Sequence, residues 1–207
     1  NSPQNGAVYN TTRLFVNIST IGANNIWFYN GSDNIVYTAP DFANFAEGNN
    51  TLIVYVNDSA GNSDNLTKNF TISLTSPIIL LTAPGNLTIT NRTSINFTAN
   101  LSDNYGLRNA TLNIYNETGS YNLATIDLGG SLQLTMGIVI SLIDGVYDWF
   151  WEVFDLAGNF VSTQSGNIAP LERDNKTSIS ATGLTTVTGV QVRPYFVDSQ
   201  QVDQICQ

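Results

Sequence analysis

The chain has 207 residues, of which 42% are apolar and 11% aromatic, which is enough for one large or two small folded domains. Only 11% of the residues are charged, and the net charge of −9 leaves just 7 Lys plus Arg. With so few basic residues we expect neither nucleic acid nor an anionic membrane surface as a partner.

The apolar runs of the chain are short. Pro77–Pro84 and Met136–Ile143 fall well below the about 20 residues that a membrane helix requires, so we expect no membrane span. The chain begins with Asn1 and shows no leader pattern, so we expect that any secretion signal has been removed or that the chain is a fragment. Cys206, the single cysteine, excludes an internal disulfide; we interpret it as an unpaired thiol, with intermolecular pairing as the alternative.

In chain order, apolar and polar residues alternate over short segments separated by turn-rich sequences, which predicts β-strands with one buried face. The turns are 29–34, 102–106 and 115–120. No window carries the apolar spacing of an amphipathic helix. The predicted inner rows are Leu14/Val16/Ile18, Leu52/Val54/Val56, Leu66/Phe70/Ile72/Leu74 (interrupted by Lys68), Ile95/Phe97/Ala99/Leu101, Leu112/Ile114 and Trp149/Trp151/Val153.

One hairpin sequence occurs twice: VYVNDSAGN at 54–62 returns as WEVFDLAGN at 151–159. Asp58 and Asp155 can each accept backbone N–H bonds two residues on, and the following Gly tolerates positive φ. A tight turn flanked by alternating strands predicts a hairpin in each copy. We therefore expect domains at 1–75 and 76–167, joined near Pro77, and a C-terminal extension at 168–207.

The segment DGVYDWFWEVFDLAGN (144–159) resembles the strand and hairpin of prokaryotic immunoglobulin-like or fibronectin-like repeats. The residues 102–116 are similar to the early strands of such repeats. This resemblance covers both copies, although Asn50 stands where the pattern has the tyrosine of Tyr147. It implies an all-β chain of two tandem immunoglobulin-like antiparallel β-sandwiches, and for function it implies stalks, adhesins, envelope components or accessory modules.

The chain is rich in the N-glycan acceptor pattern Asn-x-Ser/Thr, with a strong bias to its first half. A purely structural origin is the alternative, because polar strand faces readily place Thr two residues after Asn. Asn65, Asn69, Asn96 and Asn100 are predicted on outward faces. The fourteen candidate sites are Asn10, Asn17, Asn30, Asn49, Asn57, Asn65, Asn69, Asn86, Asn91, Asn96, Asn100, Asn109, Asn116 and Asn175.

The sequence favours no catalytic site, because it lacks His and scatters its 16 Asp and Glu over turns and strand ends. We therefore expect that the protein is not an enzyme and has no cofactor or resident metal. The oxygen-rich turns at 57–65 and 102–104 could bind Ca²⁺, but turn formation accounts for the same residues. Lys68 is interpreted as a side chain that extends to solvent, with an intramolecular isopeptide bond as the alternative.

The aromatic residues are expected in two settings. Trp149 and Trp151 belong to an inner row, so we predict core packing rather than a sugar-stacking platform. Phe150 and Phe154 alternate with them and should lie on the outer face of domain 2, where exposed aromatics commonly mark a contact surface.

From residue 167 on, β-branched residues continue without the repeated hairpin, which favours an arm that pairs with a neighbouring subunit or begins another module. Small domains of eukaryotic secreted proteins commonly carry disulfides, so dense glycan acceptors without a disulfide framework favour the hypothesis of an archaeal cell envelope. We therefore expect an extracellular, self-associating, glycosylated subunit of a surface filament, pilus or surface layer. The alternative is an adhesin or carbohydrate-binding module of a cellular or viral surface protein.

Overall fold

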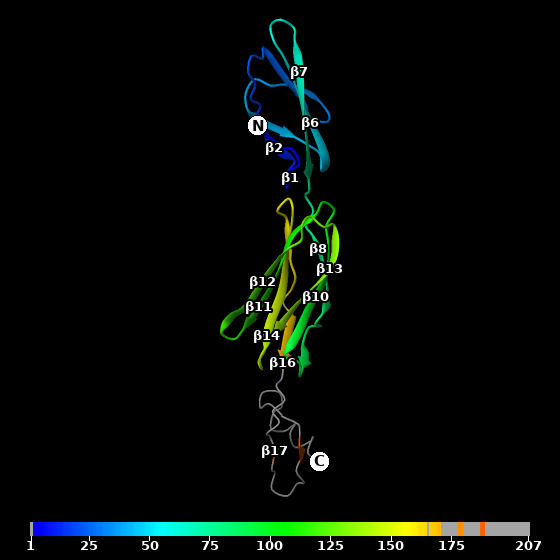
Figure 1. Cartoon of the computed structure of the whole chain (residues 1–207), viewed down its shortest axis with the longest axis vertical. Coiled ribbons are helices and arrows are strands. Elements are labelled where there is room, and N and C mark those ends of the chain that lie inside the picture. Colours follow the sequence, from blue (N-terminus) through cyan, green and yellow to red (C-terminus); the bar gives the residue numbers. More distant parts are fainter. Residues whose placement is uncertain (1, 165, 171–177, 180–186, 189–207) are drawn as a thin grey trace.

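The computed structural model describes residues 2–164, 166–170, 178–179 and 187–188, and within these ranges every regular element is a β-strand. Two β-sandwiches follow one another along the long axis of the molecule (Figure 1). The predicted all-β fold class is therefore confirmed. Most of the predicted C-terminal arm lies outside the described residues, apart from the paired strands β17 (Ser178–Ile179) and β18 (Val187–Thr188).

Domain 1 packs a five-stranded sheet against a two-stranded one around a core that includes Phe28, Leu52, Val54, Phe70 and Ile72. Alternation of apolar and polar residues on the strands creates the buried inner face of each sheet. In spatial order the larger sheet contains β1 (Val8–Tyr9), β7 (Ser63–Ile72), β6 (Gly48–Asn57), β3 (Asn25–Tyr29) and β4 (Asn34–Val36), and the smaller contains β2 (Arg13–Val16) and β5 (Asp41–Asn44).

Domain 2 is larger, and Trp149 and Trp151 occupy its core with exposed fractions of 1% and 0%. In spatial order, the strands of one sheet are β12 (Gly119–Asp127), β11 (Leu107–Asn116), β14 (Tyr147–Asp155), β16 (Gly166–Pro170) and β9 (Thr88–Thr90). The strand β15 (Phe160–Ser162) also pairs with β14. The strands of the other sheet are, in spatial order, β13 (Gln133–Ser141), β10 (Ser94–Ser102) and β8 (Ile78–Ala83).

The two domains share a plan, as the repeated hairpin sequence predicts. Each hairpin follows the long central strand of its domain, β6 or β14, and leads into the return strand, β7 or β15. Each domain also contains one parallel pair: β1 lies beside β7, and β9 lies beside β16. The hairpin, its strand and this parallel pairing therefore recur as a unit.

Three details differ from the predicted inner rows and boundaries. Leu66 and Leu74 are 49% and 45% exposed, because Leu66 lies beside a surface groove and Leu74 follows the end of β7 in the linker. Ile18 lies beyond the end of β2 and is half-buried. The strand β16 continues past the boundary predicted at residue 167, and Ile168 is 1% exposed in the core of domain 2.

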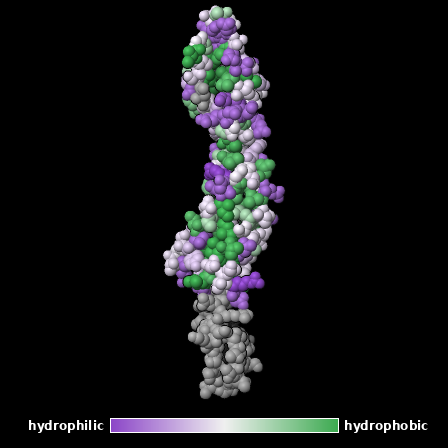
Figure 2. Space-filling model, viewed as in Figure 1, coloured by the Kyte–Doolittle hydropathy of each residue, from purple (hydrophilic) through white to green (hydrophobic). Residues whose placement is uncertain are grey.

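The surface is uneven in hydropathy. In the view of Figure 2, hydrophilic residues cover much of domain 1, whereas a band of apolar residues runs along domain 2. Exposed apolar side chains of domain 2 include Ile78, Leu80 and Val139 on the β13-β10-β8 sheet. Among the described residues, no helix is long and apolar enough to cross a membrane.

Candidate functional site

The hairpin of domain 2 holds the linker that leaves domain 1. Asn159 donates from Nδ2 to the backbone carbonyl oxygens of Ser73 at 2.9 Å and Thr75 at 3.2 Å. The same amide donates to Asp155 Oδ2 at 2.7 Å, and Ser73 Oγ reaches that oxygen at 3.3 Å. Asp155 and Ser73 are buried at 1% and 0% exposed. We call this arrangement the linker clamp.

Local turn chemistry builds the clamp. The backbone N–H of Asn159 donates to Asp155 Oδ1 at 2.7 Å, and Gly158 takes a φ of 94°, which glycine adopts without steric cost. The backbone N–H of Asp155 donates to the carbonyl of Asn159 at 3.0 Å. Bonds of this kind fix the Asn side chain toward the linker, so the motif that sequence analysis assigned to a turn also joins the two domains.

The hairpin of domain 1 repeats the internal bonds. Asp58 Oδ1 accepts the N–H groups of Ala60 and Asn62, each at 2.9 Å, and Asn62 Nδ2 donates to Asp58 Oδ2 at 2.8 Å. The side-chain bond from Asn62, followed by the backbone bonds, lowers the pKa of Asp58 below its ordinary value. Here Asn62 is exposed and Asp58 half-buried, in contrast to the buried Asp155.

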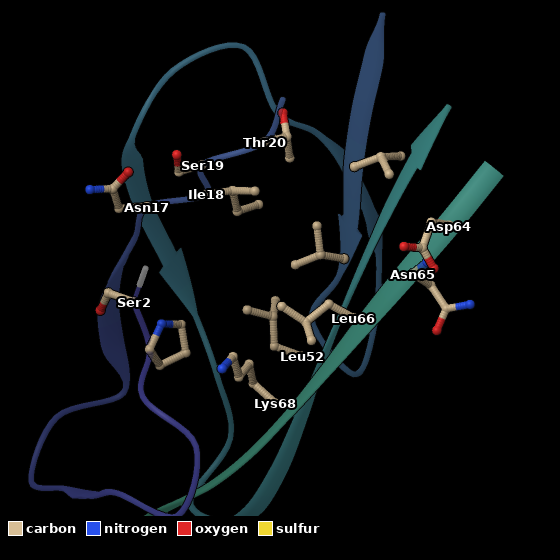
Figure 3. A pocket seen from close by; sticks show the side chains of 13 residues that line it. Ser2, Asn17, Ile18, Ser19, Thr20, Leu52, Asp64, Asn65, Leu66 and Lys68 are labelled. Carbon is tan, nitrogen blue, oxygen red and sulfur yellow. The ribbon is translucent and has the colours of Figure 1, made fainter. Parts of the chain in front are cut away.

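A groove of about 270 Å³ opens on domain 1 beside this hairpin. Ser2, Asn17 and Ile18 lie along one side, and Asn65 and Leu66 of β7 lie along the other (Figure 3). Leu52, Val54 and Val56 of β6 form its floor, so its interior is the edge of the domain core. Lys68 lines the groove as well, on the row that the sequence predicts as apolar.

The outer face of domain 2 carries two aromatic pairs. Phe150 stacks on Tyr115 with ring centroids 5.9 Å apart and an interplanar angle of 5°, and Phe154 stacks on Phe160 at 5.3 Å and 25°. The Arg108 guanidinium lies 5.2 Å from the centre of the Phe154 ring. The structure thus places both predicted contact residues on the outer face, where each is half-buried and stacked on another ring.

Polar groups separate the two pairs. Asn113 Nδ2 donates to Glu152 Oε2 at 3.3 Å, and the hydroxyls of Thr111 and Thr125 lie 2.9 Å apart on neighbouring strands. Asn113 is only 4% exposed, so the polar groups of this face that a ligand can reach are Glu152 and the two threonine hydroxyls. These groups can hydrogen-bond to the hydroxyls of a sugar whose ring stacks on the aromatic side chains.

All acceptor asparagines within the described residues lie at the surface, either exposed or half-buried. Asn65, Asn69 and Asn96 are exposed on their strands and Asn100 is half-buried, each on the outer face of its sheet, as the alternation predicts. Asn175 lies outside the described residues. The geometry leaves room for glycans at these positions; occupancy itself stays a prediction.

Two acceptor patterns also pair with one another. Asn49 lies opposite Thr71, and Thr51 lies opposite Asn69, on the antiparallel strands β6 and β7. Each threonine hydroxyl donates to the asparagine Oδ1 across from it, at 2.9 Å to Asn69 and 3.0 Å to Asn49. Cross-strand pairing therefore gives Asn-x-Thr a structural use besides glycan attachment.

The turns proposed for Ca²⁺ are engaged in bonds of their own. Asp103 Oδ1 accepts the N–H groups of Tyr105 and Gly106 at 2.8 Å each, as a turn-forming carboxylate does. The other oxygen, Oδ2, is buried without a hydrogen-bond partner beside a hollow that Thr75, Ser76 and Asn104 help to line. In the part of the chain that the structure describes, no group of three or more His, Cys, Asp or Glu could hold a metal.

No protein-family model and no curated protein matches the chain. Solved structures similar to it include fibronectin-like modules and domains of titin. Fibronectin(III)-like modules of Clostridium thermocellum CbhA share 15% identity at a TM-score of 0.46, over 83% of this chain and 92% of that one. Domains A168–A170 of titin share 10% at 0.41 over 82% and 61%, and chicken CNTN1 FN1–FN3 share 9% at 0.38 over 81% and 62%.

Sequence reasoning missed several members of these sites. Arg108, Tyr115 and Phe160 join the predicted Phe150 and Phe154 because of cross-strand register, which only the pairing of β11, β14 and β15 reveals. The contact of Asn159 with the linker also went unpredicted. Its signal was present in the repeated Asp-x-Ala-Gly-Asn sequence, but the partner groups are backbone carbonyls and carry no sequence pattern.

Proposed function

We propose that this chain is a non-catalytic extracellular structural protein, a glycosylated subunit of a surface filament, pilus or surface layer. The observation that carries the proposal is the linker clamp. Asn159 and Asp155 bond to the linker at Ser73 and Thr75, so the connection between the domains is held by bonds as well as by the chain. A series of domains held in this way suits a protein that bears load along its axis.

The glycan acceptors support the same role. They lie at the surface of both domains, including Asn96 and Asn100 on one sheet face and Asn65 and Asn69 on another. N-glycans on such faces would cover the sides of the subunit and direct association toward its ends. An archaeal source belongs to this proposal, because it rests on the combination of acceptors with a single cysteine.

Assembly through the C-terminal arm is the finer part of the proposal. Residues 171–207 continue beyond β16 with β-branched sequence that suits strand pairing with a neighbour. Sedimentation velocity of the full chain beside a chain ending at Pro170 tests this. We expect large assemblies from the full chain and monomers from the truncated one; monomers in both samples would contradict the proposal. Ending at Pro170 keeps the buried Ile168 and strand β16 intact.

The aromatic face supports a second candidate, an adhesin or carbohydrate-binding module. The outer face of domain 2 offers the rings of Phe150, Tyr115, Phe154 and Phe160, with the half-buried Glu152 between the two pairs. Glycan-array binding by the monomer, lost in Phe150→Ala with Phe154→Ala, would favour this candidate. Trp27→Ala is a matched control, because Trp27 stacks on Tyr55 at 5.6 Å on domain 1.

A further inference from the structure

Each domain has one end that carries its hairpin, and the two domains differ in what covers this end. In domain 2, the linker residues Ser73 and Thr75 bond to the hairpin, and the strand β8 that follows pairs with β10. Ile79 and Leu81 of β8 pack against the core of domain 2. A single segment, Ser73–Leu81, which bends at Thr75 and becomes a strand at Ile78, therefore covers both the hairpin and the sheet edge.

Strand register identifies the same position on domain 1. Ser2 lies opposite Asn17 just as Ala83 lies opposite Thr98, and Ser2 and Ala83 each precede a proline. The pairing in domain 2 continues with Leu81 opposite Ala99 and Ile79 opposite Leu101. In domain 1 the positions that match Ala99 and Leu101 are Ile18 and Thr20, and both line the groove.

The lining of the groove is suited to binding an extended strand. Its floor consists of Leu52, Val54 and Val56, which match the fully buried Trp149, Trp151 and Val153 of domain 2 in the repeated sequence. Leu66, on its wall, leaves 49% of its surface exposed. Apolar side chains that alternate along an extended strand are the groups that such a groove would bury.

The hairpin next to the groove contains the same Asn–Asp bond as the linker clamp of domain 2. Asn62 holds the same bond to Asp58 that Asn159 holds to Asp155, at 2.8 and 2.7 Å. In domain 2 the same amide also reaches two linker carbonyls, whereas Asn62 is exposed on the surface. A backbone passing this hairpin in the path of Ser73–Thr75 would meet the same donor.

We propose that this end of domain 1 is a docking surface for the exit segment of another module of the same kind. The occupant is an extended strand with the chemistry of Ser73–Leu81. It presents carbonyl groups to Asn62, then runs antiparallel to residues 17–20 and places two alternate apolar side chains in the groove. Domain 1 would then stack on a further module as domain 2 stacks on domain 1.

The test is a full chain with the sequence of Ser73–Leu81 fused directly ahead of residue 1. Hydrogen exchange at residues 17–21 should slow by about tenfold or more, since a paired edge opens less often. The side-chain amide of Asn62 should shift in NMR spectra, and the thermal midpoint of domain 1 should rise. An unchanged exchange rate and midpoint would overturn the proposal.

Two variants of the fusion separate specific docking from a general effect of added residues. Serine at the fused positions of Ile79 and Leu81 should abolish the protection, because the groove would receive no apolar side chain. In the fusion, Asn62→Ala should leave the apolar contacts in the groove in place but reduce the rise in the thermal midpoint of domain 1. Protection that survives the serine changes would contradict the strand site. These results do not depend on polymer formation, so failure of the proposed filament would leave them unaffected.

Discussion

The side-chain amide of Asn159 donates a 2.9 Å hydrogen bond to the carbonyl of Ser73, so a residue of the domain 2 hairpin binds the last part of domain 1. Asn159 also reaches Thr75 and Asp155, which makes one amide group the meeting point of linker and hairpin. A short turn motif of domain 2 thus holds the linker between the domains.

Replacing Asn159 should loosen this connection. In Asn159→Ala the carbonyls of Ser73 and Thr75 lose a donor, and the buried Asp155 loses one partner. We expect domain 2 to lose about 1–3 kcal/mol in its free energy of unfolding by urea, the usual cost of a broken buried bond. NMR relaxation should show more independent tumbling of the domains.

The control is Asn62→Ala, which removes the same bond within the hairpin of domain 1 but no linker contact. Equal losses in the two variants, with unchanged tumbling in both, would show that the linker contact contributes nothing.

A side chain at Gly166 should destabilise domain 2. A Cβ at this position would lie 2.8 Å from the Trp149 ring, in the fully packed core of domain 2. We expect Gly166→Ala to cost about 1–3 kcal/mol through overpacking, measured by chemical denaturation of domain 2. Gly85→Ala is the control, because its nearest neighbour would be 3.6 Å away; similar losses in both variants would contradict the packing argument.

Alkaline pH should destabilise domain 2 through Tyr147. Burial, with Tyr121 beside it, raises the pKa of Tyr147 above its ordinary value. Between the ordinary pKa of about 10 and the raised one, the unfolded chain binds fewer protons, so stability falls as pH rises. Tyr147→Phe should flatten this part of the pH profile of the thermal midpoint of domain 2. An identical slope in wild type and Tyr147→Phe would refute the assignment.

Acid should open the hairpin of domain 1. The pKa of Asp58 is lowered in the folded state, chiefly by the bond from Asn62. The stabilisation that this bond gives is therefore present at a pH above the ordinary pKa of Asp58 and is lost as the pH falls through its pKa in the folded state. The side-chain amide signals of Asn62 should therefore move toward random-coil values only below about pH 4. Movement complete at higher pH would contradict the Asp58 assignment.

Glycans on Asn96 and Asn100 should shield apolar surface. Asn100 lies opposite Leu80 and Asn96 opposite Val139, and these apolar side chains are 61% and 62% exposed. In glycosylated native material, Asn96→Gln with Asn100→Gln should increase light scattering by lateral association, whereas Asn10→Gln should not. Peptide mass spectrometry that finds bare asparagines at both sites would contradict the glycan part of the account.

The sequence predicts the strand faces well because alternation reports burial directly, as in Ile95, Phe97, Ala99 and Leu101, all buried in the structure. It also predicts both hairpins, since Asp and Gly have narrow roles in turns. It could not predict the groove beside Leu66, because alternation alone assigns that residue to the core. Nor could it pair Phe154 with Phe160 and Arg108, which depends on the register of three strands.

The most direct test of the central claim, that the chain is the subunit of an ordered surface assembly, is electron microscopy of native material at neutral pH. The preparation is compared with the same protein ending at Pro170. Ordered filaments or sheets from the full chain, absent after truncation, are the predicted result. Dispersed monomers in both samples would contradict the assembly and give the adhesin or carbohydrate-binding function first place.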